Sequence, residues 1–239
     1  MKMNNSGFLN VAKASFKKYL ETGARSNEKL KIFHGAISED LYNRLNDPFS
    51  YHVYSLGFGH GTEKAIQGRY INKWVDITVT NNSGEPIAGI AVKYVMSNYQ
   101  QNSNNYFENM LGETANIRCS NIPYFQMFII PEYIPYFDNS KQITKWEHFD
   151  IHNIEKYIQL SKDNVDSFLH TPNKTLVAIL DFNPSGRGKL RTLSEYRNYY
   201  LNNHFEALYS EAEYSFSRGV VYNDYDLFMN KVVHTIKGL

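Results

Sequence analysis

Cysteine is nearly absent from this chain, since Cys119 is the one cysteine in 239 residues. An intramolecular disulfide needs two cysteines, so no disulfide framework supports the fold, and the composition is typical of a reducing compartment. The chain also lacks any run of about 18 uncharged apolar residues, the length that a membrane-spanning helix needs. Its first ten residues contain no apolar segment of the signal-peptide type. We therefore expect a soluble, cytoplasmic protein with no membrane partner.

Neither sign of charge predominates. The 25 Lys and Arg residues nearly balance 24 Asp and Glu residues, which leaves a net charge of +1. Any contact with nucleic acid must then come from local patches. With 239 residues, 42% of them hydrophobic, the chain can bury a sizeable core. We predict a single domain over residues 1–239, with a helical N-terminal region at 1–50, an α/β core at 60–182 and a helical C-terminal region at 192–239.

Two segments near the middle of the chain have the alternating pattern of strands. In residues 74–80, Asp76 lies on the polar side of the alternation, and in residues 88–95 the lone charge is Lys93. The turn residues 81–84 join them as a hairpin. Directly opposed residues share one side of a sheet, so aligning the two apolar faces brings Asp76 and Lys93 together on the other side. Their separation along the strands is uncertain by about 7 Å, because the register is not known.

Periodicity predicts further elements around this hairpin. Helices are expected over residues 7–22, 27–36, from 38 onward, over 62–69, after the polar loop at 99–105, over 146–169 and in two tracts of 192–239; buried strands are expected at 123–131 and 174–182. The hairpin's second strand, the helix after it and the strand at 123–131 form a crossover, which predicts a parallel, right-handed connection.

A carboxylate beside an ammonium in one pocket suits metal-assisted hydrolysis of phosphodiesters. Mg²⁺ binds through one or two carboxylates, several waters and the phosphate of a substrate. A lysine in the same pocket can orient or activate the attacking water and counter the developing charge. Asp76 and Lys93 are therefore the first candidates for catalytic residues.

An Asp on one hairpin strand, Ala91-Val92-Lys93 on the next and a polar helix after it resemble the PD-(D/E)xK superfamily of nucleases, in particular type II restriction endonucleases. The resemblance covers residues 60–131, and its motif is short. It implies a mixed α/β fold whose central mixed sheet is flanked by helices. It also implies sequence-specific, Mg²⁺-dependent cleavage of double-stranded DNA, a homodimer, and functional pairing with a cognate DNA methyltransferase.

The chain departs from the family pattern at Ala91, where an acidic residue usually stands two positions before the lysine. Either the second carboxylate has moved, the residue has been changed from the native one, or the site is inactive. Some of the resembling enzymes supply this carboxylate from the helix after the lysine strand, and that helix offers Glu108 and Glu113. We favour Glu108 for its distance from the lysine, although Asn105 and Glu108 also fit a capping box. Glu113 lies on the polar face of the same helix.

The resemblance also implies a glutamate from the helix before the hairpin, and Glu63 matches it; a surface glutamate is the alternative reading. The predicted metal ligands are thus Asp76, Glu108 and Glu63. Predicted DNA contacts come from the polar loop and from a basic turn near residue 187, and they are Gln100, Gln101, Asn104, Asn105, Arg187, Lys189 and Arg191. Such side chains reach base edges and phosphates, but they also occur in ordinary loops.

Two other functions are open at this stage. The chain can be a nuclease-fold protein that has lost its metal and only binds nucleic acid or another partner, which Ala91 permits. It can also be a structure-selective nuclease that cuts branched or damaged DNA without sequence preference.

Overall fold

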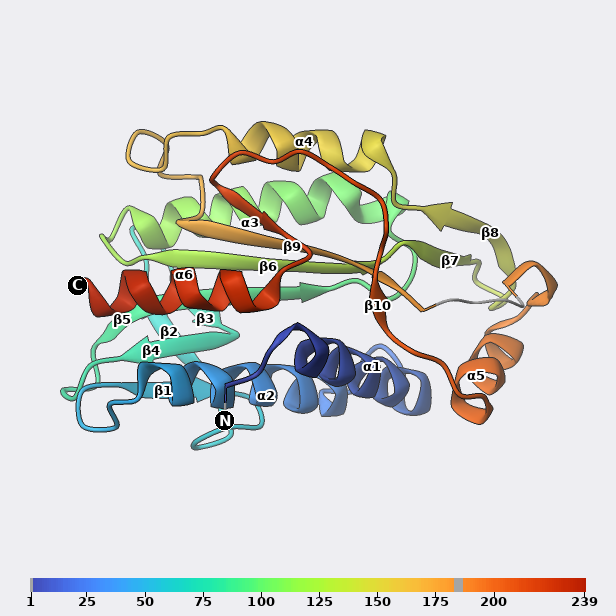
Figure 1. Ribbon diagram of the computed structural model, residues 1–239, viewed down its shortest axis with the longest axis horizontal. Coiled ribbons are helices and arrows are strands. Elements are labelled where there is room, and N and C mark those ends of the chain that lie inside the picture. Colours follow the sequence, from blue (N-terminus) through green and yellow to red (C-terminus); the bar gives the residue numbers. More distant parts are fainter. Residues whose placement is uncertain (1, 183–186) are drawn as a thin grey trace.

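A mixed sheet forms the centre of the computed structural model, which describes residues 2–182 and 187–239 (Figure 1). Within these residues the sheet has seven strands in the order β1-β4-β5-β6-β9-β10, with β11 also paired to β9. The elements are α1 (Asn5–Thr22), α2 (Glu28–Leu45), β1 (His52–Ser55), β2 (Lys64–Gln67), β3 (Asn72–Val75), β4 (Ile77–Thr80), β5 (Pro86–Tyr94), η1 (Gln100–Asn102), α3 (Ser103–Arg118), β6 (Tyr124–Pro131), β7 (Tyr133–Phe137), β8 (Ile143–His148), α4 (Ile151–Ser161), β9 (Lys174–Asp181), η2 (Arg187–Lys189), α5 (Leu193–Asn202), β10 (Leu208–Tyr209), β11 (Val220–Tyr222) and α6 (Tyr225–Lys237).

Helices cover both faces of this sheet. Side chains alternate along a strand, so β6 sends Met127 to one face and Phe128 to the other. Met127 packs in a core with residues of α1, α2, α5 and α6, whereas Phe128 packs with residues of α3 and α4. Figure 1 shows α3 and α4 on one side of β6 and β9, with α1 and α2 on the other. The predicted mixed α/β fold with a central sheet between helices is confirmed.

The middle of the sheet is parallel. β5 pairs with β6 and β6 with β9 in parallel, and both predicted buried strands are present as β6 and β9. α3 connects β5 to β6, as the predicted crossover requires. β1, β4 and β10 add antiparallel strands. The predicted hairpin is the β4–β5 pair, and its register places Ile77 opposite Ile90.

The chain breaks its strand at Asp76, so the single strand predicted over residues 74–80 is wrong. β3 pairs with β2 in a separate two-stranded sheet, and β4 pairs with β1 and β5. The Asp76 carboxylate accepts a hydrogen bond from the Val92 N–H at 2.7 Å, so a side chain satisfies a backbone donor just past the end of the β4–β5 ladder. Val75 consequently packs with Ile66 in a small cluster apart from Ile77.

Residues 64–67 form strand β2, where we predicted a helix over 62–69. β2 pairs with β3, and Ile66 is fully buried beneath this hairpin. So short a helix has little stability of its own, and strand pairing with burial of one side chain outweighs it. Glu63 therefore lies directly before a strand.

α2 is one continuous helix, whereas we predicted a break between residues 36 and 38. Phe33, Ile37 and Leu41 are buried at helical spacing and continue one apolar face past Ser38. The Ser38 hydroxyl donates a hydrogen bond to Ser55 Oγ at 2.7 Å, so its polar group is satisfied inside the protein.

The helix predicted over residues 146–169 is wrong at both ends. Residues up to His148 form β8, which pairs with β7, and α4 begins after Asp150, whose side chain accepts from the His152 N–H. The predicted helical C-terminal region contains α5 and α6 but also β10 and β11, which pair with β9. Periodicity separates strands from helices poorly in short apolar segments.

A buried ion pair joins α2 to α6. Arg44 and Asp40 are both almost fully buried, with Arg44 Nε 2.8 Å from Asp40 Oδ2. Arg44 Nη2 also contacts Asp226 Oδ1 at 2.7 Å, and the Tyr225 hydroxyl donates to Asp40 Oδ2 at 2.8 Å. Each charge in this cluster has a partner. No helix among the described residues is both long and apolar enough to cross a membrane.

Candidate active site

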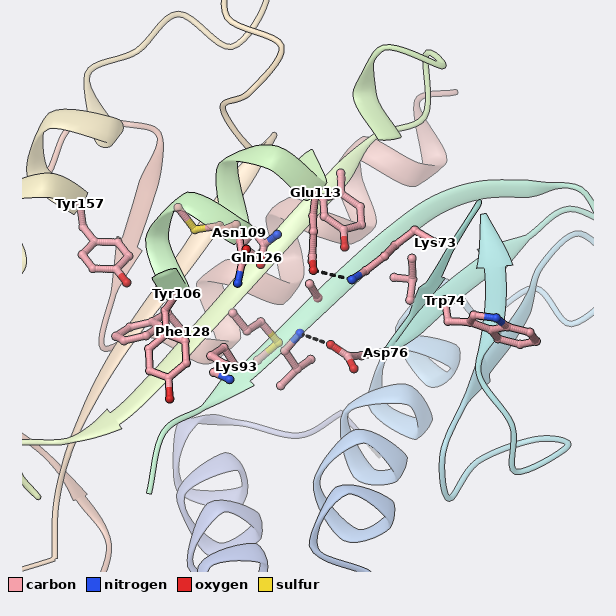
Figure 2. Close-up of a pocket in the computed structure, with 16 residues that line it drawn as sticks. Lys73, Trp74, Asp76, Lys93, Tyr106, Asn109, Glu113, Gln126, Phe128 and Tyr157 are labelled. Atoms are coloured by element: carbon pink, nitrogen blue, oxygen red, sulfur yellow. Dashed lines mark hydrogen bonds and ion pairs between the residues drawn. The ribbon is translucent and has the colours of Figure 1, made fainter. Parts of the chain in front are cut away.

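Asp76 and Lys93 line one cavity beside the sheet (Figure 2). The cavity has a volume of about 280 Å³ and lies between β3, β5, β6 and α3. A water molecule occupies about 30 Å³ of liquid, so the space suffices for a hydrated ion and a phosphate group. Both residues reach it because Asp76 follows β3 directly and Lys93 lies near the end of β5.

One hydrogen bond holds the Asp76 carboxylate, and the His34 ring lies near its other oxygen. Its Oδ2 accepts the Val92 N–H, and its Oδ1 lies 3.9 Å from Nδ1 of His34. Burial raises the pKa of Asp76 to about 6, against the lowering effect of the Val92 hydrogen bond; the charge of Glu113 raises this pKa further. A carboxylate that is costly to ionise when alone is well suited to a bound cation.

Lys93 extends over an aromatic ring. Its Nζ lies 4.1 Å from the centre of the Tyr106 ring, a cation–π distance. Burial lowers the pKa of Lys93, while the charges of Asp76 and Glu113 act in the opposite direction. The Tyr106 ring contacts an amine that gives up its proton more readily than a solvated lysine.

The structure brings Glu113, not Glu108, to the cavity. Glu113 lines it and forms an ion pair with Lys73 at 2.5 Å, whereas Glu108 is exposed and does not line it. Five residues along a helix correspond to a rotation of about 140°, so the two glutamates cannot share a face. The capping-box reading of Asn105 and Glu108 is wrong, because α3 begins two residues earlier, at Ser103.

A second cavity continues from the same two residues toward the N-terminal helices. Asp76 and Lys93 border it together with His34 of α2. His34 is 2% exposed, and among the described residues its Nδ1 has no hydrogen-bond partner. Ligand atoms of His34, Glu63 and Asp76 all lie within 4.8 Å of one another. Glu63 therefore stands beside Asp76 as the resemblance implied, although from a strand edge and not from a helix.

These three residues fit a divalent cation. Two carboxylates and a neutral imidazole are common metal ligands. Burial lowers the pKa of His34 to about 4, against the charge of Glu63, so the ring is neutral near pH 7. Burial and the charge of Asp76 raise the pKa of Glu63. The two neighbouring carboxylates therefore repel each other, and a bound cation would relieve this repulsion. Mg²⁺ prefers oxygen ligands, so the imidazole fits it less well than the carboxylates do.

Helix α3 also anchors the β2–β3 hairpin beside the cavity. The Asn116 side chain accepts from the Tyr70 N–H at 2.9 Å and donates to the Ile71 carbonyl at 2.9 Å. A Cβ atom on Gly68 would lie 2.1 Å from Asn116 Nδ2, so only glycine permits this approach. The hairpin in turn positions Lys73 for its pairing with Glu113.

The predicted DNA contacts whose side chains the structure describes do not line the cavity. Gln100, Gln101, Asn104 and Asn105 are exposed in η1 and the first turn of α3. Gln100 Oε1 accepts from Lys145 Nζ at 2.5 Å. Arg187 and Lys189 belong to η2, Lys189 and Arg191 are exposed, and residues 183–186 of the basic turn lie outside the described residues. Figure 1 shows neighbouring α5 at the opposite end of the molecule from β2 and β3.

Sequence reasoning missed His34 and Lys73. His34 could have been found from the sequence, because it follows Phe33 in a segment with helical spacing of apolar residues. A histidine on the buried face of a helix must have a hydrogen-bond partner or a ligand. Lys73 could not have been found, because its pairing depends on the unpredicted β2–β3 hairpin. No family model matches this chain, and neither the curated proteins nor the solved structures contain a match.

Proposed function

We propose that this protein is a divalent-metal-dependent endonuclease that cleaves double-stranded DNA at a specific sequence, as a type II restriction endonuclease with a PD-(D/E)xK-like core. One observation carries the proposal. Asp76 lines a cavity with Lys93 and also belongs to a group of three residues that can hold a metal. A carboxylate shared between a cation and a lysine-lined pocket suits metal-assisted hydrolysis of phosphodiesters.

Asp76 and Glu63 supply two carboxylates for the ion, for which the sequence predicts Mg²⁺. When bound, such an ion polarises a phosphoryl oxygen and offsets its developing charge. Lys93 orients the attacking water, and because burial lowers its pKa, a larger fraction of the side chain is the neutral amine that can accept a proton. The contact with the Tyr106 ring places the amine at the cavity before substrate arrives.

Glu113 supplies a carboxylate for this chemistry in place of the acidic residue that the family pattern has where this chain has Ala91. Ala91 lines the same cavity and its side chain leaves room there. Glu113 reaches the cavity from α3, and Lys73 neutralises part of its charge. The charge of Glu113 also acts on Asp76, which supports a migrated second carboxylate.

The β2–β3 hairpin offers a nucleic-acid contact beside the cavity. Tyr70, Ile71 and Trp74 are 79%, 64% and 64% exposed, and Trp74 and Lys73 line the cavity. Exposed aromatic rings next to cations are typical of surfaces that contact bases and backbone. A homodimer would present two such hairpins and two cavities to a two-fold symmetric site. Pairing with a cognate methyltransferase belongs to the same proposal.

Digestion of plasmid and phage DNA tests the proposal. The wild-type chain, with Mg²⁺ or Mn²⁺, is expected to produce discrete fragments, and Asp76→Asn is expected to produce none. Glu108→Gln is the matched control, because Glu108 is an exposed carboxylate outside the cavity. Intact DNA with every metal, or equal cleavage by Asp76→Asn, contradicts the proposal. Cleavage of branched DNA alone identifies a structure-selective nuclease.

A second candidate is a nuclease-fold protein that binds DNA without cutting it. Ala91 favours it, as does the Lys73 ion pair, which occupies one oxygen of Glu113. Gel-shift assays with the same DNA separate the two functions. Retarded but uncut DNA that is insensitive to Asp76→Asn supports the binder.

A further inference from the structure

His34 is a buried polar residue near Asp76 whose ring nitrogen Nδ1 lacks a hydrogen-bond partner among the residues that the structure describes. It is almost completely buried, at 2% exposure. The nearest acidic atom, Asp76 Oδ1, is 3.9 Å away, which is too long for a hydrogen bond. Leaving a buried polar atom unpaired is unfavourable, because the atom has lost its hydrogen bonds to water. This cost is offset if a ligand, such as a metal ion, binds the unpaired nitrogen.

The spacing of the three ligand atoms suits one ion. Two ligands of one ion lie at most about 4.4 Å apart, which is twice a metal–ligand bond of about 2.2 Å. The ligand atoms of His34, Glu63 and Asp76 lie within 4.8 Å of one another. Side-chain movements of a few tenths of an ångström would therefore bring all three to bonding distance of one ion. Glu63 is only partly buried, which leaves it free to make this adjustment, while the Val92 hydrogen bond keeps Asp76 in place.

The type of donor determines the type of ion. Carboxylates accept Mg²⁺, Ca²⁺ and Mn²⁺, whereas an imidazole nitrogen favours first-row transition ions. The His34 ring is buried on α2, its Nδ1 is unpaired within the described part of the chain, and its ligand atom lies with those of Glu63 and Asp76. An ion held by all three residues has nitrogen as one of its ligands.

We propose that His34, Glu63 and Asp76 form a mixed nitrogen–oxygen site that selects a first-row transition ion, with Mn²⁺ as its probe, over Mg²⁺. His34 is the residue that provides this selection. The inference deepens the proposed function by naming the class of its cofactor, but metal binding is measured without DNA. It also revises the predicted Mg²⁺ cofactor.

Pulsed electron paramagnetic resonance of Mn²⁺ bound to the metal-stripped full chain tests the proposal. The wild-type spectrum is expected to contain a nitrogen coupling from an imidazole ligand. His34→Asn places an amide near the ring position, and it is expected to remove this coupling and weaken Mn²⁺ binding about 10- to 100-fold. In the His34→Asn variant the site has lost its nitrogen ligand, so Mg²⁺ should displace bound Mn²⁺ at a lower concentration than it does in the wild-type chain.

His148→Asn is the matched control. His148 is an exposed histidine whose Nε2 lies 3.3 Å from a carboxylate oxygen of Glu132, outside the proposed site. This variant is expected to keep both the nitrogen coupling and the wild-type affinity. A wild-type spectrum without nitrogen coupling overturns the inference even if His34→Asn fails to fold, and so does a coupling that persists in a folded His34→Asn variant.

The failure of this inference differs from the failure of the nuclease proposal. Mn²⁺ bound through nitrogen in a protein that cuts no DNA upholds the metal site and overturns the nuclease. Metal-dependent cleavage by a protein whose bound Mn²⁺ shows no nitrogen coupling upholds the nuclease and overturns the role of His34.

Discussion

Two polar clusters lie against helix α2, and they differ in how completely their atoms are paired. Arg44 and Asp40 contact each other, and further partners satisfy the remaining bonds. At His34 and Asp76 the imidazole nitrogen has no partner among the described residues, and burial raises the carboxyl pKa to about 6. In the first cluster the buried Arg44 and Asp40 neutralise each other, and each has a partner inside the protein. The second is incomplete, and we expect a cation to complete it.

The largest expected effect comes from breaking the complete cluster. Arg44→Met leaves Asp40 buried without its counter-charge, and we expect the free energy of unfolding to fall by about 3–5 kcal/mol. Chemical denaturation measures this change. The double variant Asp40→Asn with Arg44→Met should recover part of the loss, because it removes the buried charge as well. A loss below about 1 kcal/mol in Arg44→Met would contradict the structural role of the cluster.

Adding a metal should affect only the incomplete cluster. At a Mn²⁺ concentration 100 times its Kd, we expect the free energy of unfolding to rise by about 2.7 kcal/mol in the wild-type chain. Asp76→Asn should lose this gain, while Asp226→Asn at the other cluster should keep it. Thermal unfolding with and without Mn²⁺, followed by chelation, provides the measurement. Equal stabilisation of both variants would mean that the ion binds elsewhere.

Much of the frame around the site could be predicted from local signals. The turn residues at 81–84 predicted the β4–β5 hairpin, and the apolar runs predicted β6 and β9, because neighbouring residues determine these features. The break at Asp76 could not be predicted, since it depends on a hydrogen bond to Val92. The proximity of His34 could not be predicted either, because it comes from a helix 42 residues earlier in the chain.

The choice between the two glutamates of α3 depends on which helix face meets the sheet. Glu108 was favoured for its distance from Lys93 along the chain, but that distance does not determine how the helix is turned. In the structure α3 packs against β6 with Glu113 at the cavity, while Glu108 stays exposed. The alternative reading of Asn105 and Glu108 as a capping box failed for another reason, because α3 begins at Ser103 and helix ends are set by weak local interactions.

Removing the Asn116 clamp should have a smaller effect. Asn116→Ala deletes the side-chain bonds that attach the β2–β3 hairpin to α3, and we expect a loss of about 1–2 kcal/mol. Hydrogen exchange should accelerate for residues 68–73, while the Arg44 cluster keeps its protection. Asn105→Ala, an exposed change in the same helix, is the control. Unchanged exchange in the hairpin would show that Asn116 does not hold it.

The smallest expected effect separates the two glutamates of α3. Glu113→Gln removes a carboxylate from the cavity and leaves Lys73 without its partner, so we expect the cleavage rate to fall about tenfold, or about 1.4 kcal/mol. Glu108→Gln should leave the rate within about twofold of wild type, because its side chain is exposed. Rates measured on one DNA substrate compare them. The reverse order would restore Glu108 as the second carboxylate.

The most direct measurement is the single-turnover rate of DNA cleavage by Lys93→Met at a saturating metal concentration. Lys145→Met is its control, because Lys145 also lies over a tyrosine ring, that of Tyr136, but outside the cavity. We predict that Lys93→Met binds metal as the wild-type chain does and cleaves at least about 100-fold more slowly, while Lys145→Met cleaves normally. Cleavage by Lys93→Met at the wild-type rate would contradict the account.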